Sequence, residues 1–129
     1  MTTGIGESSL AKKIEEWEEE IRSKGMSLAY LPSPGIVKLR ITSKSDTNKT
    51  FIEDKLSELE HLLPVYAYGR DEVSLEEVVG ELLKKEKATV GVVESCTGGN
   101  IGGYFTRVPG ASEYFMGSLV TYSYAAKEA

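Results

Sequence analysis

The chain has 129 residues, enough for one domain or two small ones, because a hydrophobic core becomes marginal below about 70 residues. Its net charge of −5 gives it no overall electrostatic attraction for nucleic acid or for an anionic membrane surface. No apolar run approaches the roughly 18 residues of a membrane-spanning helix and no signal-peptide pattern is present, so we expect a cytoplasmic protein. A single cysteine, Cys96, and a single histidine, His61, exclude an internal disulfide and are too few for a structural zinc site built by the chain alone.

The first half of the chain is predicted to form a small α-β-β-α-β unit of the α+β class. Apolar residues recur at helical spacing in two segments, and two strand-like runs between them flank the turn Pro32-Ser33-Pro34-Gly35. The expected elements are a helix from Ser8 or Ser9 to Lys24, a hairpin of strands over residues 26–31 and 36–42, a helix from about Thr50 to the residue before Pro64, and a strand over residues 65–68.

The pattern restarts near residue 71, which predicts a second unit over residues 71–129. Ser74-Leu75-Glu76-Glu77 is a capping box that starts a new helix. The elements expected after it are a strand over residues 89–93, a turn over residues 94–99, a helix to about Arg107, a short segment over residues 112–115 and a strand over residues 118–122. This α-β-α-β alternation predicts an α/β unit with a parallel or mixed sheet, although two strands are few for one.

The turn over residues 94–99, which reads Glu-Ser-Cys-Thr-Gly-Gly, is the strongest candidate for chemistry. It lies between a predicted strand and a predicted helix. The unpaired backbone N–H groups at the start of a helix point outward together, which suits a phosphate group or a developing oxyanion. A hydroxyl, a thiol and two glycines therefore stand where a nucleophile and an anion site can form.

Three motifs in this order and at this spacing resemble the CinA family. They are Glu94-Ser95-Cys96-Thr97-Gly98-Gly99, Val108-Pro109-Gly110-Ala111-Ser112-Glu113-Tyr114-Phe115, and Val120-Thr121-Tyr122-Ser123 with Lys127. Upstream, Gly4-Ile5-Gly6-Glu7-Ser8 is similar to the linker that follows the first domain of full-length CinA proteins. The resemblance covers nearly the whole chain.

The resemblance implies that residues 1–70 are a KH-like middle domain and that residues 71–129 begin a three-layer α/β domain. In the family that domain is a nicotinamide mononucleotide deamidase of the PncC type, so the resemblance implies an amidohydrolase that acts on a small-molecule nucleotide without a metal or a cofactor. A molybdopterin-binding-like N-terminal domain and most of the deamidase domain are then missing. We expect this truncated chain to be inactive, and the deamidase domain to form a homo-oligomer.

Deamidation of a carboxamide needs a nucleophile, a base, a donor for the oxyanion and a proton for the departing ammonia. The resemblance points to Ser95 as the nucleophile, Lys127 as the base and Tyr122 as a hydroxyl that relays a proton or holds the lysine. Substrate binding is expected from Cys96, Thr97, Gly98, Gly99 and Ser112. Tyr124 and Ala125 stand where family members commonly have Asn and Glu, which is expected to weaken the site.

Without the resemblance, blander interpretations of these residues remain open. Ser95 or Thr97 can cap the following helix, and Cys96 can be either the nucleophile or a small buried side chain. Tyr122 can be a packed aromatic on a strand, and Lys127 a solvated lysine. Ser112, after Pro-Gly-Ala, can cap a helix, and His61 can lie near the C-terminal carbonyls of its own helix.

Two other functions were weighed against the amidohydrolase. The second unit can be a phosphate- or nucleotide-binding module without catalysis, in which case binding depends on Gly98 and Gly99 but not on Lys127. RNA binding by residues 1–70 is not expected, because the Gly-x-x-Gly loop of KH domains is absent and ten basic residues face eleven acidic ones, a net charge of −1.

Overall fold

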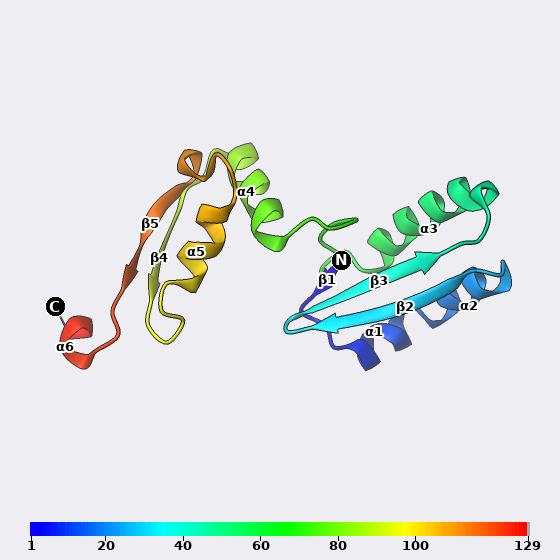
Figure 1. The fold of residues 1–129 in the computed structure, drawn as a ribbon, viewed down its shortest axis with the longest axis horizontal. Coiled ribbons are helices and arrows are strands. Elements are labelled where there is room, and N and C mark those ends of the chain that lie inside the picture. The colour runs from blue at the N-terminus through cyan, green and yellow to red at the C-terminus, as the bar shows by residue number, and fades with distance from the viewer. Residues whose placement is uncertain (129) are drawn as a thin grey trace. The chain divides into compact units, whose positions relative to one another are not determined.

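The computed structural model describes residues 1–128 (Figure 1), and the chain divides into two compact units. The first is Met1–Glu72 and the second begins at Val73. Helices alternate with short strands that form one three-stranded and one two-stranded sheet, which confirms the predicted α+β class. No helix within residues 1–128 has both the length and the apolar character needed to span a bilayer.

The sheet of the first unit is antiparallel with the strand order β1-β3-β2. Its strands are β1 (Thr2–Thr3), β2 (Ser27–Ser33) and β3 (Ile36–Thr42). The predicted hairpin is confirmed, but β2 runs further than expected, to Ser33, which pairs with Ile36. The turn is therefore only Pro34-Gly35, where the proline ring fixes one φ and Gly35 has a φ of +77°, as a type II turn requires.

Three helices cover this sheet: α1 (Glu7–Lys13), α2 (Glu15–Ser23) and α3 (Lys49–Leu62), the last preceded by a 3₁₀ turn, η1 (Asp46–Asn48). The prediction of one helix from Ser8 or Ser9 to Lys24 was wrong, because the helix breaks at Ile14, which has φ −116° and ψ 19°. No glycine or proline marks this position. The apolar stripe stays buried on both sides of the break, so packing against the sheet sets the bend, and helical periodicity does not encode it.

The predicted strand over residues 65–68 is also corrected. Only Ala67 pairs, in an isolated antiparallel bridge with Thr2. The sequence did not signal β1, a two-residue strand whose Thr2 hydroxyl is buried and donates to the carbonyl of Val37 at 2.6 Å. Because its hydrogen bonds are made to residues more than 30 positions away, no local pattern predicts it.

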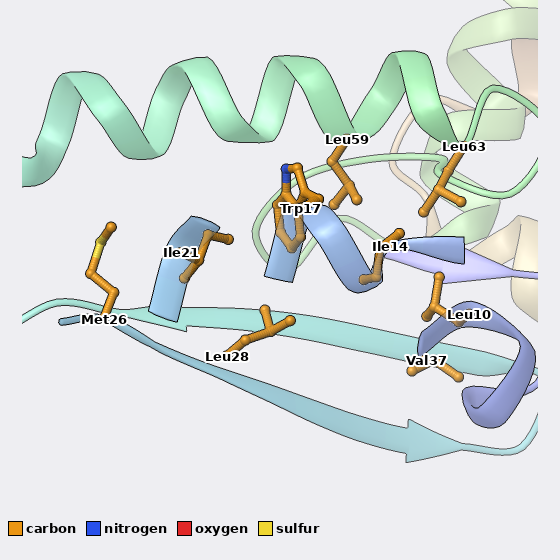
Figure 2. Packing of buried hydrophobic residues seen from close by; sticks show 9 residues of the cluster. All are labelled: Leu10, Ile14, Trp17, Ile21, Met26, Leu28, Val37, Leu59 and Leu63. Carbon is orange, nitrogen blue, oxygen red and sulfur yellow. The ribbon is translucent and has the colours of Figure 1, made fainter. Parts of the chain in front are cut away.

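The core of the first unit lies between the three helices and the sheet (Figure 2). Its buried members come from both sides: Leu10, Ile14, Trp17, Ile21, Met26, Leu28, Val37, Leu59 and Leu63. The indole N–H of Trp17 donates to the carbonyl of Lys55 on α3 at 2.9 Å, so the largest core side chain is also satisfied as a donor. This apolar cluster holds the KH-like unit together.

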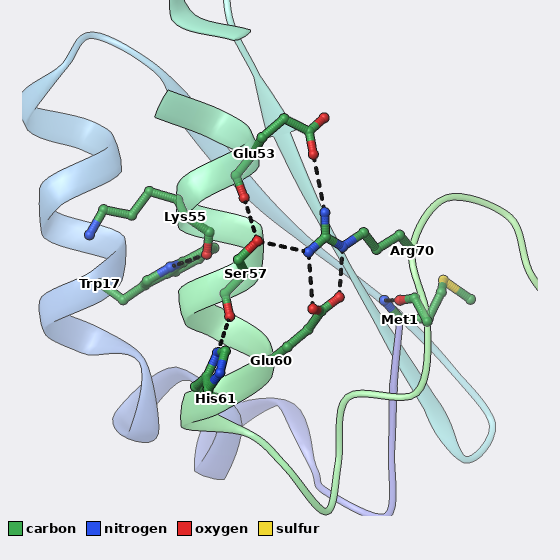
Figure 3. Close-up of polar contacts among 9 residues, drawn as sticks. Met1, Trp17, Glu53, Lys55, Ser57, Glu60, His61 and Arg70 are labelled. Carbon is green, nitrogen blue, oxygen red and sulfur yellow. Dashed lines mark hydrogen bonds and ion pairs between the residues drawn. The ribbon is translucent and has the colours of Figure 1, made fainter. Parts of the chain in front are cut away.

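Arg70 fastens the segment that leaves the first unit to α3 (Figure 3). Its guanidinium donates to both oxygens of Glu60, at 2.6 and 3.0 Å, and to Glu53 and Ser57, each at 3.1 Å. His61, on the same helix, lies 2.7 Å from the carbonyl oxygen of Ser57, consistent with the expectation of a residue near the helix end. These contacts are exposed, and their role is to fix the path of the chain.

The second unit has the order α-β-α-β followed by a short terminal helix. Its elements are α4 (Leu75–Glu86), β4 (Val90–Glu94), α5 (Asn100–Arg107), the 3₁₀ turn η2 (Ala111–Glu113), β5 (Phe115–Val120) and α6 (Tyr124–Glu128). The predicted capping box is confirmed, because Ser74 and Glu77 exchange side chain–backbone hydrogen bonds. β4 and β5 are parallel, from Val90 beside Phe115 to Glu94 beside Val120.

Helix α5, the crossover between the two strands, covers one face of this sheet. Phe105 stacks on Phe115 with ring centroids 5.2 Å apart. The opposite face carries three exposed apolar side chains, with exposed fractions of 72% for Val93, 75% for Met116 and 67% for Leu119. An open apolar face of this kind favours association, and the homo-oligomer expected for this domain stays a prediction.

The core of the first unit predicts a contrast between two neighbouring leucines. Leu63 is fully buried and Leu62 is 48% exposed. We expect Leu63→Ala to lower the free energy of unfolding of this unit by about 2–5 kcal/mol, and Leu62→Ala by less than about 1 kcal/mol. Trp17 is the only tryptophan, so tryptophan fluorescence during urea unfolding reports on the first unit alone. Equal losses in the two variants would contradict this core.

Candidate functional site

The turn between β4 and α5 lies at the carboxyl end of the parallel strand pair, the edge at which open α/β sheets bind ligands. It consists of residues 95–99. The N–H of Gly98 donates to the carbonyl of Ser95 at 3.0 Å, and the N–H of Asn100 to that of Thr97 at 3.1 Å. Gly98 and Gly99 have φ of +60° and +93°, which explains why glycines stand here.

Glu94, the last residue of β4, is the buried acid of this unit and is 3% exposed. Its carboxylate accepts the backbone N–H of Ile101 at 3.0 Å and of Gly102 at 2.8 Å, at the start of α5. The Ser118 hydroxyl on β5 donates to it at 2.9 Å. No role for Glu94 was predicted from the sequence. The available signal was an acidic residue at the end of an apolar strand, where its side chain can reach the helix that follows.

Glu94 is strongly held as an anion. Burial by itself would raise the pKa of its carboxyl, but hydrogen bonds from the N–H groups of Gly102 and Ile101 and from the hydroxyls of Thr97 and Ser118 outweigh burial and lower the pKa to about 2. A carboxylate at a helix N-terminus also faces the positive end of the helix dipole. The start of α5 therefore already binds an anion, which is the carboxylate of Glu94.

Ser95 does not cap α5. The N-cap is Gly99, without a side-chain cap, and Glu94 takes the N–H groups that a capping serine would accept. Within residues 1–128 the Ser95 hydroxyl has no hydrogen-bond partner, and neither have the N–H groups of Thr97 and Gly99. The turn thus contains a half-buried hydroxyl together with unused backbone N–H groups, including that of Cys96, and these are the kinds of group that nucleophilic attack with oxyanion binding requires.

The pairing of the two strands brings the segment after β5 beside this turn. Glu94 pairs with Val120, and the N–H of Thr121 donates to the carbonyl of Glu94 at 2.8 Å. Ser95 and Tyr122 therefore follow adjacent strands at one edge of the sheet. The predicted strand over residues 118–122 is corrected, because β5 ends at Val120 and Tyr122 lies beyond it, 74% exposed rather than packed.

Lys127 lies on α6 and is exposed. Its ammonium is 5.5 Å from the ring centroid of Tyr124. In the part of the chain that the structure describes, no hydrogen bond or ion pair joins Lys127 or Tyr122 to Ser95. The structure thus places the three predicted catalytic residues after neighbouring strands but does not bring them into contact.

Cys96 and Ser112 have different positions relative to the turn. Cys96 is an exposed free thiol within it, so the alternative of a small buried cysteine is wrong. Ser112 lies in η2, just before β5, at the end of the sheet where Val90 pairs with Phe115. That is the opposite end from Ser95, roughly 13 Å away along β4 at about 3.3 Å per residue. This placement removes Ser112 from the candidate site.

No cluster of three or more His, Cys, Asp or Glu side chains in residues 1–128 could hold a metal ion.

The fold and the turn together define a class: an α+β protein in which a KH-like unit precedes a β-α-β unit with a serine at its carboxyl edge. Two family descriptions match the chain. "Damage-inducible protein CinA KH domain" matches residues 1–69, and "CinA C-terminal domain" matches residues 72–129. The chain belongs to the CinA family.

Curated relatives agree with this assignment. "CinA-like protein" of Chlorobium phaeobacteroides is 46% identical over 131 residues, which cover 98% of this chain and 31% of the relative. "CinA-like protein" of Cytophaga hutchinsonii is 44% identical over 124 residues (94% and 29%). "Putative competence-damage inducible protein" of Halothermothrix orenii is 45% identical over 124 residues (93% and 29%). The chain spans less than a third of the length of these relatives.

The buried anion predicts how the stability of the second unit depends on pH. The folded pKa of Glu94, about 2, lies below the ordinary value of 4.5, so the carboxylate stabilises the folded state above pH 4.5 and this contribution is lost as the pH falls toward 2. We expect hydrogen-exchange protection of β4 and β5, corrected for intrinsic rates, to fall over this range more in the wild type than in Glu94→Gln.

The matched control is Glu86→Gln, which removes the same charge from an exposed glutamate of the same unit and should follow the wild type. An equal pH dependence in the wild type and in Glu94→Gln would contradict a depressed pKa at Glu94.

Replacing either of two adjacent glycines of α5 by alanine is expected to change the stability of the second unit, in opposite directions. A Cβ at Gly102 would lie 2.7 Å from the Cβ of Ser118 and 3.4 Å from Glu94, whereas a Cβ at Gly103 would meet nothing within 4 Å. Gly102→Ala should therefore destabilise the second unit by about 1–3 kcal/mol. Gly103→Ala should stabilise the helix by about 0.5–1 kcal/mol. Hydrogen exchange of peptides from residues 73–128 measures both, and a stabilising Gly102→Ala would show that α5 does not lie close to β5.

Proposed function

We propose that the protein is an amidohydrolase of pyridine nucleotide recycling that converts nicotinamide mononucleotide to nicotinate mononucleotide and ammonia. Ser95 is the nucleophile, Lys127 the base, and Tyr122 a hydroxyl that passes a proton or holds the lysine. The observation that carries the proposal is the unengaged hydroxyl of Ser95 at the carboxyl edge of a parallel strand pair, next to free N–H groups. Membership of the CinA family supports the same reaction class.

The reaction follows from these groups. The Ser95 oxygen attacks the carboxamide carbon and its proton passes to the side-chain nitrogen of Lys127, which acts as the base, while the carbonyl oxygen becomes an oxyanion. The N–H groups of Thr97 and Gly99 are the donors available for that oxyanion. The C–N bond then breaks, the proton goes to the leaving nitrogen to give ammonia, and water hydrolyses the acyl-serine ester to the carboxylate.

The described residues do not complete this site. Lys127 is exposed on α6 and has no contact with Ser95, so nothing here holds the base within hydrogen-bond reach of the nucleophile. We therefore expect the 129-residue chain alone to be inactive, and we assign the activity to a longer protein that contains it. The relatives, which are more than three times as long as the matched segment, support this assignment.

A nucleotide-binding module without catalysis is the second candidate, favoured by the same free N–H groups of Thr97 and Gly99. The two candidates differ in their dependence on the lysine. If the unit only binds, Lys127→Ala leaves the affinity for nicotinamide mononucleotide unchanged and no ammonia is formed by any variant. If it is an amidohydrolase, Lys127→Ala abolishes turnover.

Ammonia release from nicotinamide mononucleotide tests the proposal, measured with this chain and with the longest product of its reading frame. We expect the longer protein to be active and Ser95→Ala to lower kcat by more than about 1000-fold, because no other group replaces the nucleophile. Thr106→Ala, which removes an exposed hydroxyl of the same unit, is the matched control and should keep full activity. Undiminished turnover in Ser95→Ala, or loss in Cys96→Ala with activity left in Ser95→Ala, would defeat the assignment.

A further inference from the structure

The Glu94 carboxylate is the point at which four segments of the second unit meet. It ends β4, accepts two N–H groups from the first turn of α5 and accepts the Ser118 hydroxyl from β5, and the Thr97 hydroxyl of the turn contributes to its lowered pKa. Both oxygens are used: one by Ile101, the other by Gly102 and Ser118. A carboxylate with this many donors has one stable position.

This position determines where the next residue lies. Ser95 follows Glu94 directly, and Thr97 is two residues further along. The Glu94 side chain is hydrogen-bonded to the start of α5, and the backbone carbonyl of Glu94 accepts a hydrogen bond from the N–H of Thr121. The backbone that enters the turn is therefore held at two points. The Ser95 hydroxyl is thereby left outside this network, half-buried and without a partner.

The same carboxylate decides where a second anion can bind. The N–H groups of Ile101 and Gly102, which a phosphate or an oxyanion would otherwise use, are occupied by Glu94. A negative substrate group placed there would also face a like charge. Unused backbone donors are still present on the turn, among them the N–H groups of Cys96, Thr97 and Gly99.

We propose that Glu94 is a positioning residue of the amidohydrolase: its carboxylate fills the N-terminus of α5, fixes the turn that carries Ser95, and directs the developing oxyanion to the N–H groups of the turn. This rests on the proposed function, because Ser95 is the group being positioned. No hydrogen bond joins the Glu94 carboxylate to the Ser95 hydroxyl in the described residues, so in this proposal Glu94 acts on the rate through the geometry of the turn. Gly102 belongs to the same arrangement, since only a glycine lets α5 approach Glu94 and Ser118 so closely.

The test compares Glu94→Gln with Glu86→Gln in the longest product of the reading frame. Gln keeps the size of the side chain and removes its charge, and Glu86→Gln makes the same charge change at an exposed position. We expect Glu94→Gln to lower kcat about 10- to 100-fold with KM changed less than about threefold, because a misplaced nucleophile reacts slowly although the substrate still binds. Glu86→Gln should match the wild type in both constants.

Cys96, the only cysteine, supplies a readout that does not depend on turnover. It lies in the turn, and its alkylation by iodoacetamide depends on the electrostatics of the nearby helix N-terminus. When Glu94→Gln removes the compensating charge from the start of α5, we expect Cys96 to be alkylated about threefold faster or more. The rate in Glu86→Gln should not change.

If circular dichroism shows that Glu94→Gln does not fold, Ser118→Ala provides the test in its place. It removes one hydrogen bond from Glu94 and leaves the charge in place, so we expect kcat to fall about two- to fivefold. Unchanged kcat in a folded Glu94→Gln, an unchanged Cys96 rate in that variant, or, if it does not fold, unchanged kcat in Ser118→Ala would overturn the positioning role. Failure of the proposed function gives a different result: the wild-type protein itself releases no ammonia.

Discussion

The second unit depends on a single buried carboxylate. Within residues 1–128 its sheet has two strands, and apart from the backbone pairing of β4 with β5 and the aromatic contacts of Phe105 with Tyr114 and Phe115 the elements are joined through this carboxylate. Glu94 joins all three, because it accepts hydrogen bonds from α5 and from Ser118 on β5 while ending β4. Burial of an isolated carboxylate is unfavourable, but here charge-assisted donors offset the lost hydration. The consequence is a fixed strand-to-helix turn on a small scaffold.

The first unit is stabilised in another way. Its core is apolar and continuous, and Trp17 combines the largest buried surface with a satisfied indole N–H. Exposed ion pairs such as Arg70 with Glu60 fix the path of the chain but add little stability. The KH-like unit is therefore held by packing, whereas in the second unit the polar network is both the support of the fold and the frame of the candidate site.

Local sequence patterns predicted the elements that rest on local interactions. Helical stripes, the hairpin and the Ser74 capping box were all predicted, because spacing and turn chemistry determine them, although the hairpin turn is shorter than the predicted Pro32-Ser33-Pro34-Gly35. The break at Ile14 and the strand β1 were missed, since both depend on contacts distant in the sequence. In the site, the motif singled out the turn. It gave no sign of the bond between Glu94 and Ser118, which are 24 residues apart, and it grouped Ser112 with a turn at the other end of the sheet.

Glu94 is an anion held by the start of α5 and by β5. Its side-chain carboxyl can be followed directly by carbon-13 NMR during an acid titration of the chain, with Glu94→Gln identifying the resonance. We expect the carboxyl to stay ionised until the pH approaches 2, because its hydrogen-bond donors lower its pKa to about 2. Titration near the ordinary value of 4.5 would contradict it, because the donors of Ile101, Gly102 and Ser118 would then not be bound to the carboxylate.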